Sequence, residues 1–309
     1  MERESIKGMY FTAGAYVLWG VLPIYWKFLG GVPALEILAH RVIWSFIFVL
    51  LIVVLLKRKR LKNFFQVQMR LKKTWLGLLL ASLLISINWF VYIFAVNTNH
   101  IVEASLGYFI NPLIAVLLGV FVLGEKMNVW QAVSFVVAGI GVVYMTLSLG
   151  TFPWIALLLA LSFGFYGLSK KLLKVDSILG MLLETLFIVP FALMFLAYLG
   201  INGEHSFATG TLKNDLFLIG SGIATALPLI WFGIGAQKIP LYLVGFLQYI
   251  SPTISLLLGV LIYGESFTKD HAVSFSCIWL ALVIFSISNI RQMIKKRKES
   301  TVTIHAKSA

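Results

Sequence analysis

Two stretches of the chain decide the fold: GYFINPLIAVLLGVFVLGEKMNVWQAVSF (107–135) and LQYISPTISLLLGVLIYGESFTKDHAVSF (247–275). Aligned without gaps, they share Pro112, the pair Gly124–Glu125 and the block Ala132–Phe135, besides several aliphatic residues. Chance similarity between two apolar helices would favour Leu, Val and Ile alone. The sequence therefore contains an internal repeat.

The repeat extends towards the start of each half. NWFVYIFAVN (88–97) aligns weakly with PLIWFGIGAQ (228–237), and Trp19-Gly20 aligns with Phe163-Gly164. Each half contains five apolar segments, and an odd number makes the second copy enter a membrane from the opposite side. Inverted repeats of this kind are a transporter architecture, with the substrate site between the halves near the bilayer midplane. A duplicated membrane scaffold without a transport path is the alternative.

Composition identifies a polytopic membrane protein. The chain is 60% hydrophobic and only 12% charged, which lies far outside the range of soluble domains. Apolar runs of about 20 residues can cross the hydrocarbon core. Ten such runs are predicted, at 8–28, 34–56, 74–96, 101–123, 129–149, 153–173, 177–199, 216–236, 241–263 and 271–290. The fold class expected is thus an all-α integral membrane protein with two inverted five-helix repeats, 8–149 and 153–290, followed by a basic tail, 291–309.

The net charge of +13 comes largely from short loops and the tail, which argues for topology rather than nucleic-acid binding. Eight Lys and Arg residues lie in 57–73, three in 170–174 and five in 291–298. Basic residues mark the cytoplasmic side of bacterial membrane proteins. Both termini are therefore expected in the cytoplasm. Binding of a partner by these basic runs is the alternative.

The second predicted span opens with titratable residues, which are costly in hydrocarbon and need a reason to be there. On a helical wheel, Glu36, His40 and Trp44 form one stripe, and Arg41 lies on the neighbouring one. Glu36 and Arg41 are candidates either for the substrate path or for a structural ion pair and headgroup contacts. His40, which titrates near neutrality, is a candidate proton or substrate contact.

The fourth predicted span places Glu103, Gly107 and Asn111 along one face. Pro112 removes a backbone donor and frees the carbonyl of Tyr108, and loosened helices of this kind line transporter sites. A packing kink is the simpler explanation. In the second copy, Gln248 lies close to the equivalent proline.

Other polar and aromatic residues complete the candidate set. Asn88 and Glu184 lie within spans without an evident partner, and Trp89 and Tyr108 are candidates to stack on a substrate. Glu125 and Glu265 end their spans, which indicates capping or interface pairing.

Several motifs resemble the EamA group of the drug/metabolite transporter superfamily, over about residues 8–290. These motifs are EILAHRVIWS (36–45), NWFVYIFAVN (88–97), VEASLGYFINPL (102–113), ALSFGFYGLSKK (160–171), GMLLET (180–185) and GFLQYISPTISLLLGVLIYGE (245–265). The resemblance implies ten helices in two inverted repeats, cytoplasmic termini and a central cavity. It also implies that the fifth and tenth helices pack at the periphery, away from the substrate path.

The predicted function is a secondary transporter that moves a small organic solute across the cytoplasmic membrane by alternating access. Coupling to protons would use Glu36, His40 or Glu103, and uncoupled exchange and a homodimer stay open. A channel or lipid scramblase is the alternative. An intramembrane enzyme is disfavoured, because the aspartates lie in or near loops and neither G-x-S-x-G nor H-E-x-x-H occurs. No cofactor, metal site or nucleic-acid partner is expected.

Overall fold

The computed structural model describes residues 2–57, 72–98, 100–148, 150, 152–264 and 268–308. Only the backbone is described for Glu2, Ile93, Val96, Asn97, 101–103 and 293–308. Most of the basic loop 57–73, Glu265 and the side chain of the candidate residue Glu103 therefore lie outside the described part of the chain.

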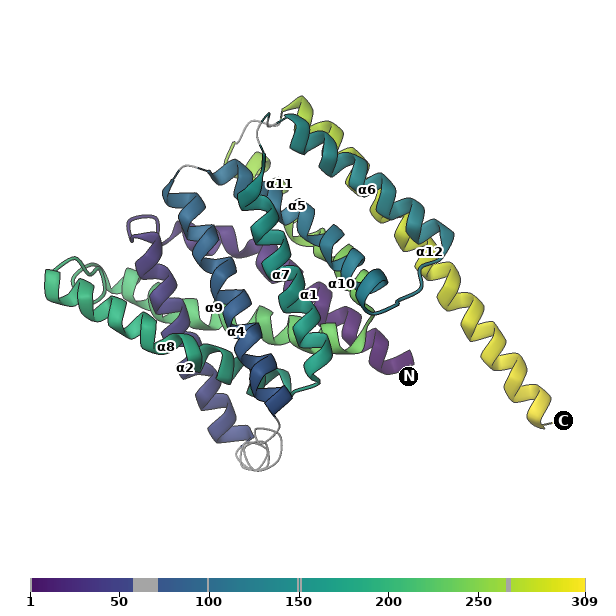
Figure 1. Cartoon of the computed structure of the whole chain (residues 1–309), viewed down its shortest axis with the longest axis horizontal. Coiled ribbons are helices and arrows are strands. Elements are labelled where there is room, and N and C mark those ends of the chain that lie inside the picture. Colours follow the sequence, from purple (N-terminus) through teal and green to yellow (C-terminus); the bar gives the residue numbers. More distant parts are fainter. Residues whose placement is uncertain are drawn as a thin grey trace.

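Helices account for all the regular secondary structure in the described ranges (Figure 1). In chain order they are α1 (Glu2–Lys27), α2 (Ala34–Leu56), α4 (Lys72–Asn97), α5 (Ile101–Leu117), the π-helix η2 (Leu118–Val122), α6 (Val129–Ser148), α7 (Trp154–Leu173), α8 (Ser177–Asn202), α9 (Leu212–Lys238), α10 (Leu241–Gln248), α11 (Ile250–Leu261) and α12 (Lys269–Ser308). The prediction of an all-helical chain is confirmed for these residues.

Among the described residues, nine helical segments are long and apolar enough to cross a membrane. They match the predicted spans from the second to the tenth, with α10 and α11 forming one segment, Leu241–Leu261. The first predicted span corresponds to α1, which carries a charged first turn and falls outside this set. The basic tail continues α12 as helix to Ser308.

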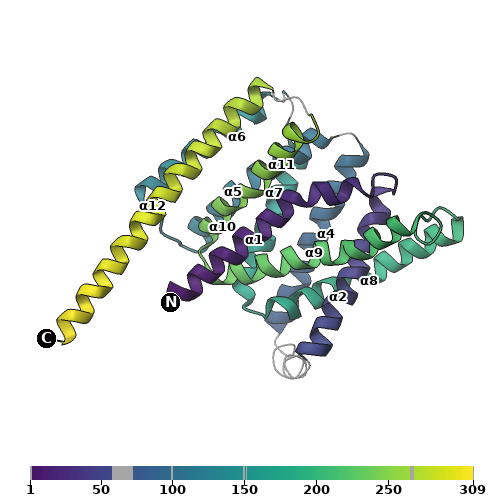
Figure 2. The same cartoon turned by 180° about the vertical axis from the view of Figure 1, so that it is seen from behind.

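The helices of the first half, α1 to α6, pack mainly on helices of the second half, α7 to α12. Helix α1 packs against α9 and α11, while α7 packs against α4 and α5. Helix α2 packs against α8 and α9, and α5 packs against α10. Helices α6 and α12 lie side by side at one edge of the molecule (Figures 1 and 2).

The two prolines of the repeat have different effects on their helices. Helix α5 continues past Pro112 and ends in η2, whereas the segment predicted as one helix over 241–263 breaks at Tyr249, before Pro252. The hydroxyl of Tyr249 donates to the carbonyl of Phe109 on α5, 3.3 Å away. The break thus coincides with a contact between the halves, which local sequence does not reveal.

Equivalent positions of the repeat share backbone features. Gly124 and Gly264 both have a positive φ, +65° and +66°, where a residue without Cβ is favoured. Helix α6 begins with reciprocal hydrogen bonds between Asn128 and Gln131, and α12 begins with the same pattern between Thr268 and His271. Such reciprocal bonds satisfy backbone donors at a helix start.

Among the described residues, three ion pairs join the halves at the end where α1 begins and α2 ends. They are Glu4–Lys238, Lys57–Asp176 and Glu125–Lys171, and together they are called the latch. Glu125 also accepts hydrogen bonds from the backbone of Leu241 and Tyr242, at 2.8 and 3.0 Å. The predicted capping and interface role of Glu125 is thereby confirmed.

Asp176 has two roles, since it pairs with Lys57 at 2.5 Å and caps α8 by accepting from Ile178 and Leu179. Burial raises the pKa of this carboxyl, but Lys57 and the two backbone donors outweigh burial and hold the pKa below its ordinary value. A lowered folded-state pKa stabilises the fold above the unfolded-state pKa, and this stabilisation is lost as the pH falls through the folded-state pKa.

Replacing Asp176 by alanine is expected to lower the free energy of unfolding by about 1–2 kcal/mol at pH 7, most of it from the lost cap. The difference from wild type should narrow as the pH falls from about 4, the ordinary pKa of an aspartate, through the lowered folded-state pKa of Asp176. Denaturation in detergent at pH 7 and at pH values below about 4 measures this. Lys57→Met, which keeps the cap, should cost less; an equal cost would contradict the capping role.

Candidate substrate path

Arg41 lies at the centre of a polar and aromatic cluster built from both halves. Its Nε donates to Oγ1 of Thr225 on α9 at 2.9 Å. Its guanidinium carbon lies 4.7 Å from the ring centre of Trp26 and 5.7 Å from that of Trp89. Among the described side chains, none forms an ion pair with Arg41. The cluster therefore holds a cation between indole rings without an acidic partner among those residues.

Tyr92 and Tyr108 complete this cluster. Both lie near Arg41, and their rings meet edge to face with centres 6.3 Å apart. Arg41 is partly buried, whereas 48% of Tyr108 and 37% of Tyr92 is exposed. The two tyrosines therefore leave accessible surface beside the guanidinium. This accessible surface, with the side chains of Trp26, Arg41, Trp89, Tyr92, Tyr108 and Thr225 around it, is called the Arg41 crevice.

A small cavity, with room for about one water molecule, lies between α5 of the first half and α7, α9 and α10 of the second. Two amides from opposite halves, Asn111 and Gln248, line it. The buried Oδ1 of Asn111 has no hydrogen-bond partner among the described residues, while Oε1 of Gln248 accepts from Tyr16 at 3.2 Å. The cavity thus offers one free acceptor in an apolar surrounding.

Five aromatic residues pack together beside this cavity: Tyr16, Trp19, Phe163, Tyr166 and Phe232. Trp19 and Phe163, which align in the repeat, meet edge to face with ring centres 5.7 Å apart. Aromatic packing of this kind adds roughly 0.5–1.5 kcal/mol per pair beyond buried area. The cluster therefore joins α1 of the first half to α7 and α9 of the second.

Glu36 and His40 lie beneath the loop that joins α8 to α9. Glu36 is fully buried and accepts three hydrogen bonds, from N and Oγ of Ser206 and from N of Phe207, at 2.6, 2.8 and 3.3 Å. The His40 ring packs on Phe207, and its Nδ1 accepts a hydrogen bond from Nε1 of Trp44. Its Nε2 lies 4.0 Å from Oε1 of Glu36. Glu36 therefore holds this loop in place.

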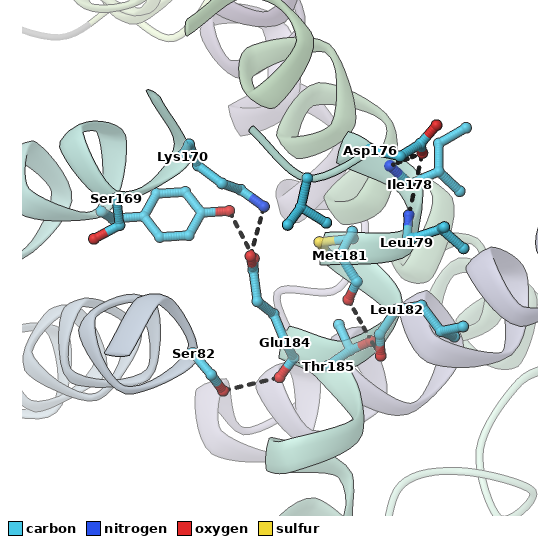
Figure 3. A network of polar contacts seen from close by, with 12 residues as sticks. Ser82, Ser169, Lys170, Asp176, Ile178, Leu179, Met181, Leu182, Glu184 and Thr185 are labelled. Carbon is cyan, nitrogen blue, oxygen red and sulfur yellow. Dashed lines mark hydrogen bonds and ion pairs between the residues drawn. The ribbon is translucent and has the colours of Figure 1, made fainter. Parts of the chain in front are cut away.

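Glu184 is half of a buried ion pair with Lys170, in which Nζ lies 2.6 Å from Oε1 (Figure 3). The hydroxyl of Tyr166 donates to the other carboxylate oxygen at 3.0 Å. Ser82 donates to the backbone carbonyl of Glu184 at 2.9 Å, which ties α4 to α8. Tyr166 also belongs to the aromatic cluster, so the pair is linked to the centre of the molecule.

The candidate residues thus separate into groups. Arg41, Trp89 and Tyr108 meet in the Arg41 crevice, and Asn111 and Gln248 meet in the cavity. Asn88 instead bridges α4 to α7, donating to the carbonyl of Leu159 at 2.9 Å and to Oγ of Ser162 at 3.0 Å. The position of the Glu103 side chain lies outside the described part.

Sequence reasoning missed several residues of these groups: Trp26, Tyr92, Thr225, Tyr166 and Lys170. Lys170 belongs to a run of basic residues that indicates a cytoplasmic loop, so its pairing with a membrane carboxylate had no local signal. Lys170 lies near the end of α7, and Glu184 lies 14 residues later on α8. Only the packing of these two helices brings the two side chains together.

Comparison with known proteins places the chain in one family. The model of the EamA-like transporter family matches residues 6–147 and 152–287. The uncharacterized transporter YojE of Bacillus subtilis is 48% identical over 94% of this chain and 97% of its own length. Protein RarD of Escherichia coli is 39% identical over 93% and 96%. A solved crystal structure shares the fold at 18% identity, with a TM-score of 0.67 over 91% of this chain and 97% of its own. The chain belongs to the EamA-like transporter family.

Proposed function

We propose that the two halves form an inverted repeat around the central cavity. Reciprocal contacts support this: a Cβ on Gly20 would lie 2.8 Å from Cβ of Ile254, and a Cβ on Gly164 would lie 2.6 Å from Cγ2 of Ile114. In the repeat, Gly20 aligns with Gly164 and Ile114 with Ile254. Each contact is thus the mate of the other, as a two-fold axis between the halves requires.

The function proposed is secondary transport of a small organic solute by alternating access, in which one half rocks against the other. The observation that carries this is the reciprocal packing of the halves around a cavity lined from both sides. The Arg41 crevice, with Asn111 and Gln248 deeper, forms the substrate path. Glu36 and His40 act through the loop above the crevice, and Glu184 acts through the aromatic cluster.

Basic residues support cytoplasmic termini for this transporter. In that orientation the latch lies on the cytoplasmic side and joins the halves there, while Arg41 lies in the half of α2 that is nearer the opposite side. The structure would then represent the outward-facing member of the transport cycle. Return to the inward-facing form would break the latch.

Uptake into proteoliposomes tests the function. Pooled amino acids and other small metabolites are offered with and without an inward-acidic pH gradient. Saturable uptake of one solute class is expected, because a carrier has a finite number of sites. Stimulation by the gradient that is lost in His40→Ala would identify proton coupling, whereas saturable uptake indifferent to pH would keep the carrier without it. Flux that does not saturate would favour the channel or scramblase, and no movement by folded protein would contradict transport of these solutes.

A further inference from the structure

Arg41 has the chemistry of an anion site. A guanidinium stays charged at any physiological pH and offers five donors, of which Nε is bonded to Thr225. Among the described residues, no carboxylate lies within 4.0 Å of it, although its side chain is partly buried between Trp26 and Trp89. A charge in such a place is expensive unless something pairs with it. The unpaired edge of the guanidinium thus calls for an anion.

The surroundings restrict what that anion can be. The planar fork of arginine matches a carboxylate through two parallel hydrogen bonds. No second cation joins Arg41 in the described part of the crevice, so a single negative charge is matched better than a doubly charged phosphate. The walls are the rings of Trp26, Trp89, Tyr92 and Tyr108, which suit an apolar or aromatic body.

We infer that the Arg41 crevice binds small organic monocarboxylates, with the carboxylate on the Arg41 guanidinium and an apolar or aromatic body against Trp89 and Tyr108. This inference rests on the proposed function, since it names the substrate class of the same path. Thr225 orients the guanidinium from α9, so both halves contribute to recognition. The indoles hold the guanidinium in place and leave its terminal nitrogens for the ligand.

Thermal shift of the full-length protein in detergent tests the inference with three matched probes: 3-phenylpropionate, 3-phenylpropionamide and 3-phenylpropylamine. A ligand that binds the folded form raises the melting temperature in a concentration-dependent way. The acid should stabilise the wild-type protein, while the amide and the amine should not. Arg41→Gln should weaken binding of the acid by about tenfold or more, and Arg41→Lys less, because lysine keeps the charge but loses the fork.

Lys213→Gln is the matched control, because Lys213 is an exposed cation that stands over Phe28, 5.0 Å from its ring centre, outside the crevice. It should bind the acid as wild type does. If Arg41→Gln does not fold, Trp89→Leu should still weaken binding of the acid by removing one wall. Equal stabilisation by acid and amide, no stabilisation by the acid, or undiminished binding in Arg41→Gln would each overturn the inference.

Uptake of the same probes separates this inference from the proposed function. Saturable uptake of the amine or the amide without uptake of the acid would overturn the carboxylate site and leave the carrier standing. Arg41-dependent binding of the acid without saturable uptake of any solute would support the site and contradict the carrier.

Discussion

Replacing Glu184 by leucine is expected to lower the free energy of unfolding by about 3–5 kcal/mol, because it leaves the ammonium of Lys170 buried without its counter-charge. Both side chains are almost inaccessible, at 5% and 2% exposure, and the pair is 2.6 Å apart. The phenol of Tyr166 would lose its acceptor in the same variant. Unfolding in detergent by increasing denaturant measures the loss.

The double variant Lys170→Met/Glu184→Leu is the control for this prediction. Removing both charges replaces the ion pair by apolar groups, which is often neutral or stabilising in a protein interior. Most of the lost stability should therefore return. A double variant as unstable as Glu184→Leu would show that the loss comes from packing rather than from the unpaired charge.

Replacing Gly222 by valine is expected to separate α9 from α2 and to lower stability by about 3 kcal/mol or more, beyond the usual cost of overpacking. Even a single Cβ at this position would overlap the backbone carbonyl carbon of Trp44 and lie 2.6 Å from N of Ser45. Backbone atoms of a packed helix cannot move aside as a flexible side chain can. The variant should also weaken the hydrogen bond from Ser45 to the carbonyl of Gly222.

Gly139→Ala is the matched control, since a Cβ there meets no other atom within 4 Å. Because alanine favours a helix over glycine, this variant should be neutral or slightly more stable. Melting temperatures of the two variants in the same detergent provide the comparison. A Gly222→Val protein as stable as wild type would contradict the close crossing of α2 and α9.

The repeat is the part of the fold that sequence predicts best. Proline, glycine and glutamate at fixed spacing are visible without a structure, and they led to the helix ends at Gly124 and Gly264 and to the cap made by Glu125. The break at Tyr249 escaped prediction. Since α5 carries the equivalent proline without breaking, proline alone does not explain the break, which coincides with the contact of Tyr249 with Phe109 in the other half.

The site was harder to predict because its partners lie far apart in the chain. Helical periodicity places Glu36 and Arg41 on neighbouring inward stripes. It does not show that Glu36 binds the backbone of Ser206 while Arg41 bonds Thr225 on α9. Periodicity identifies which face of a helix points inward, whereas the partner depends on how the helices pack. The loop anchor and the Arg41 crevice therefore emerge only from the folded chain.

A reversible disulfide across the latch end tests most directly the claim that the two halves move against each other. In a Cys277→Ser background, Gly119→Cys on η2 pairs with Leu241→Cys on α10, since a Cβ on Gly119 would lie 3.3 Å from Cβ of Leu241. Disulfides have about 3.5–4.5 Å between Cβ atoms, and the new Cβ would also lie 2.9 Å from N of Tyr242 and close to Oε2 of Glu125. Helices η2 and α10 must therefore separate slightly, and saturable uptake by the reduced double-cysteine protein at the wild-type rate is the control for this shift.

The comparison is saturable uptake by the same proteoliposomes before oxidation, after oxidation and after reduction. Gly141→Cys, which can pair with the native Cys277 between α6 and α12, serves as a lock at the edge of the molecule. Alternating access predicts that the η2–α10 disulfide stops uptake, that reduction restores it and that the α6–α12 disulfide leaves it unchanged. Undiminished uptake by the oxidised η2–α10 protein would contradict movement of the halves against each other.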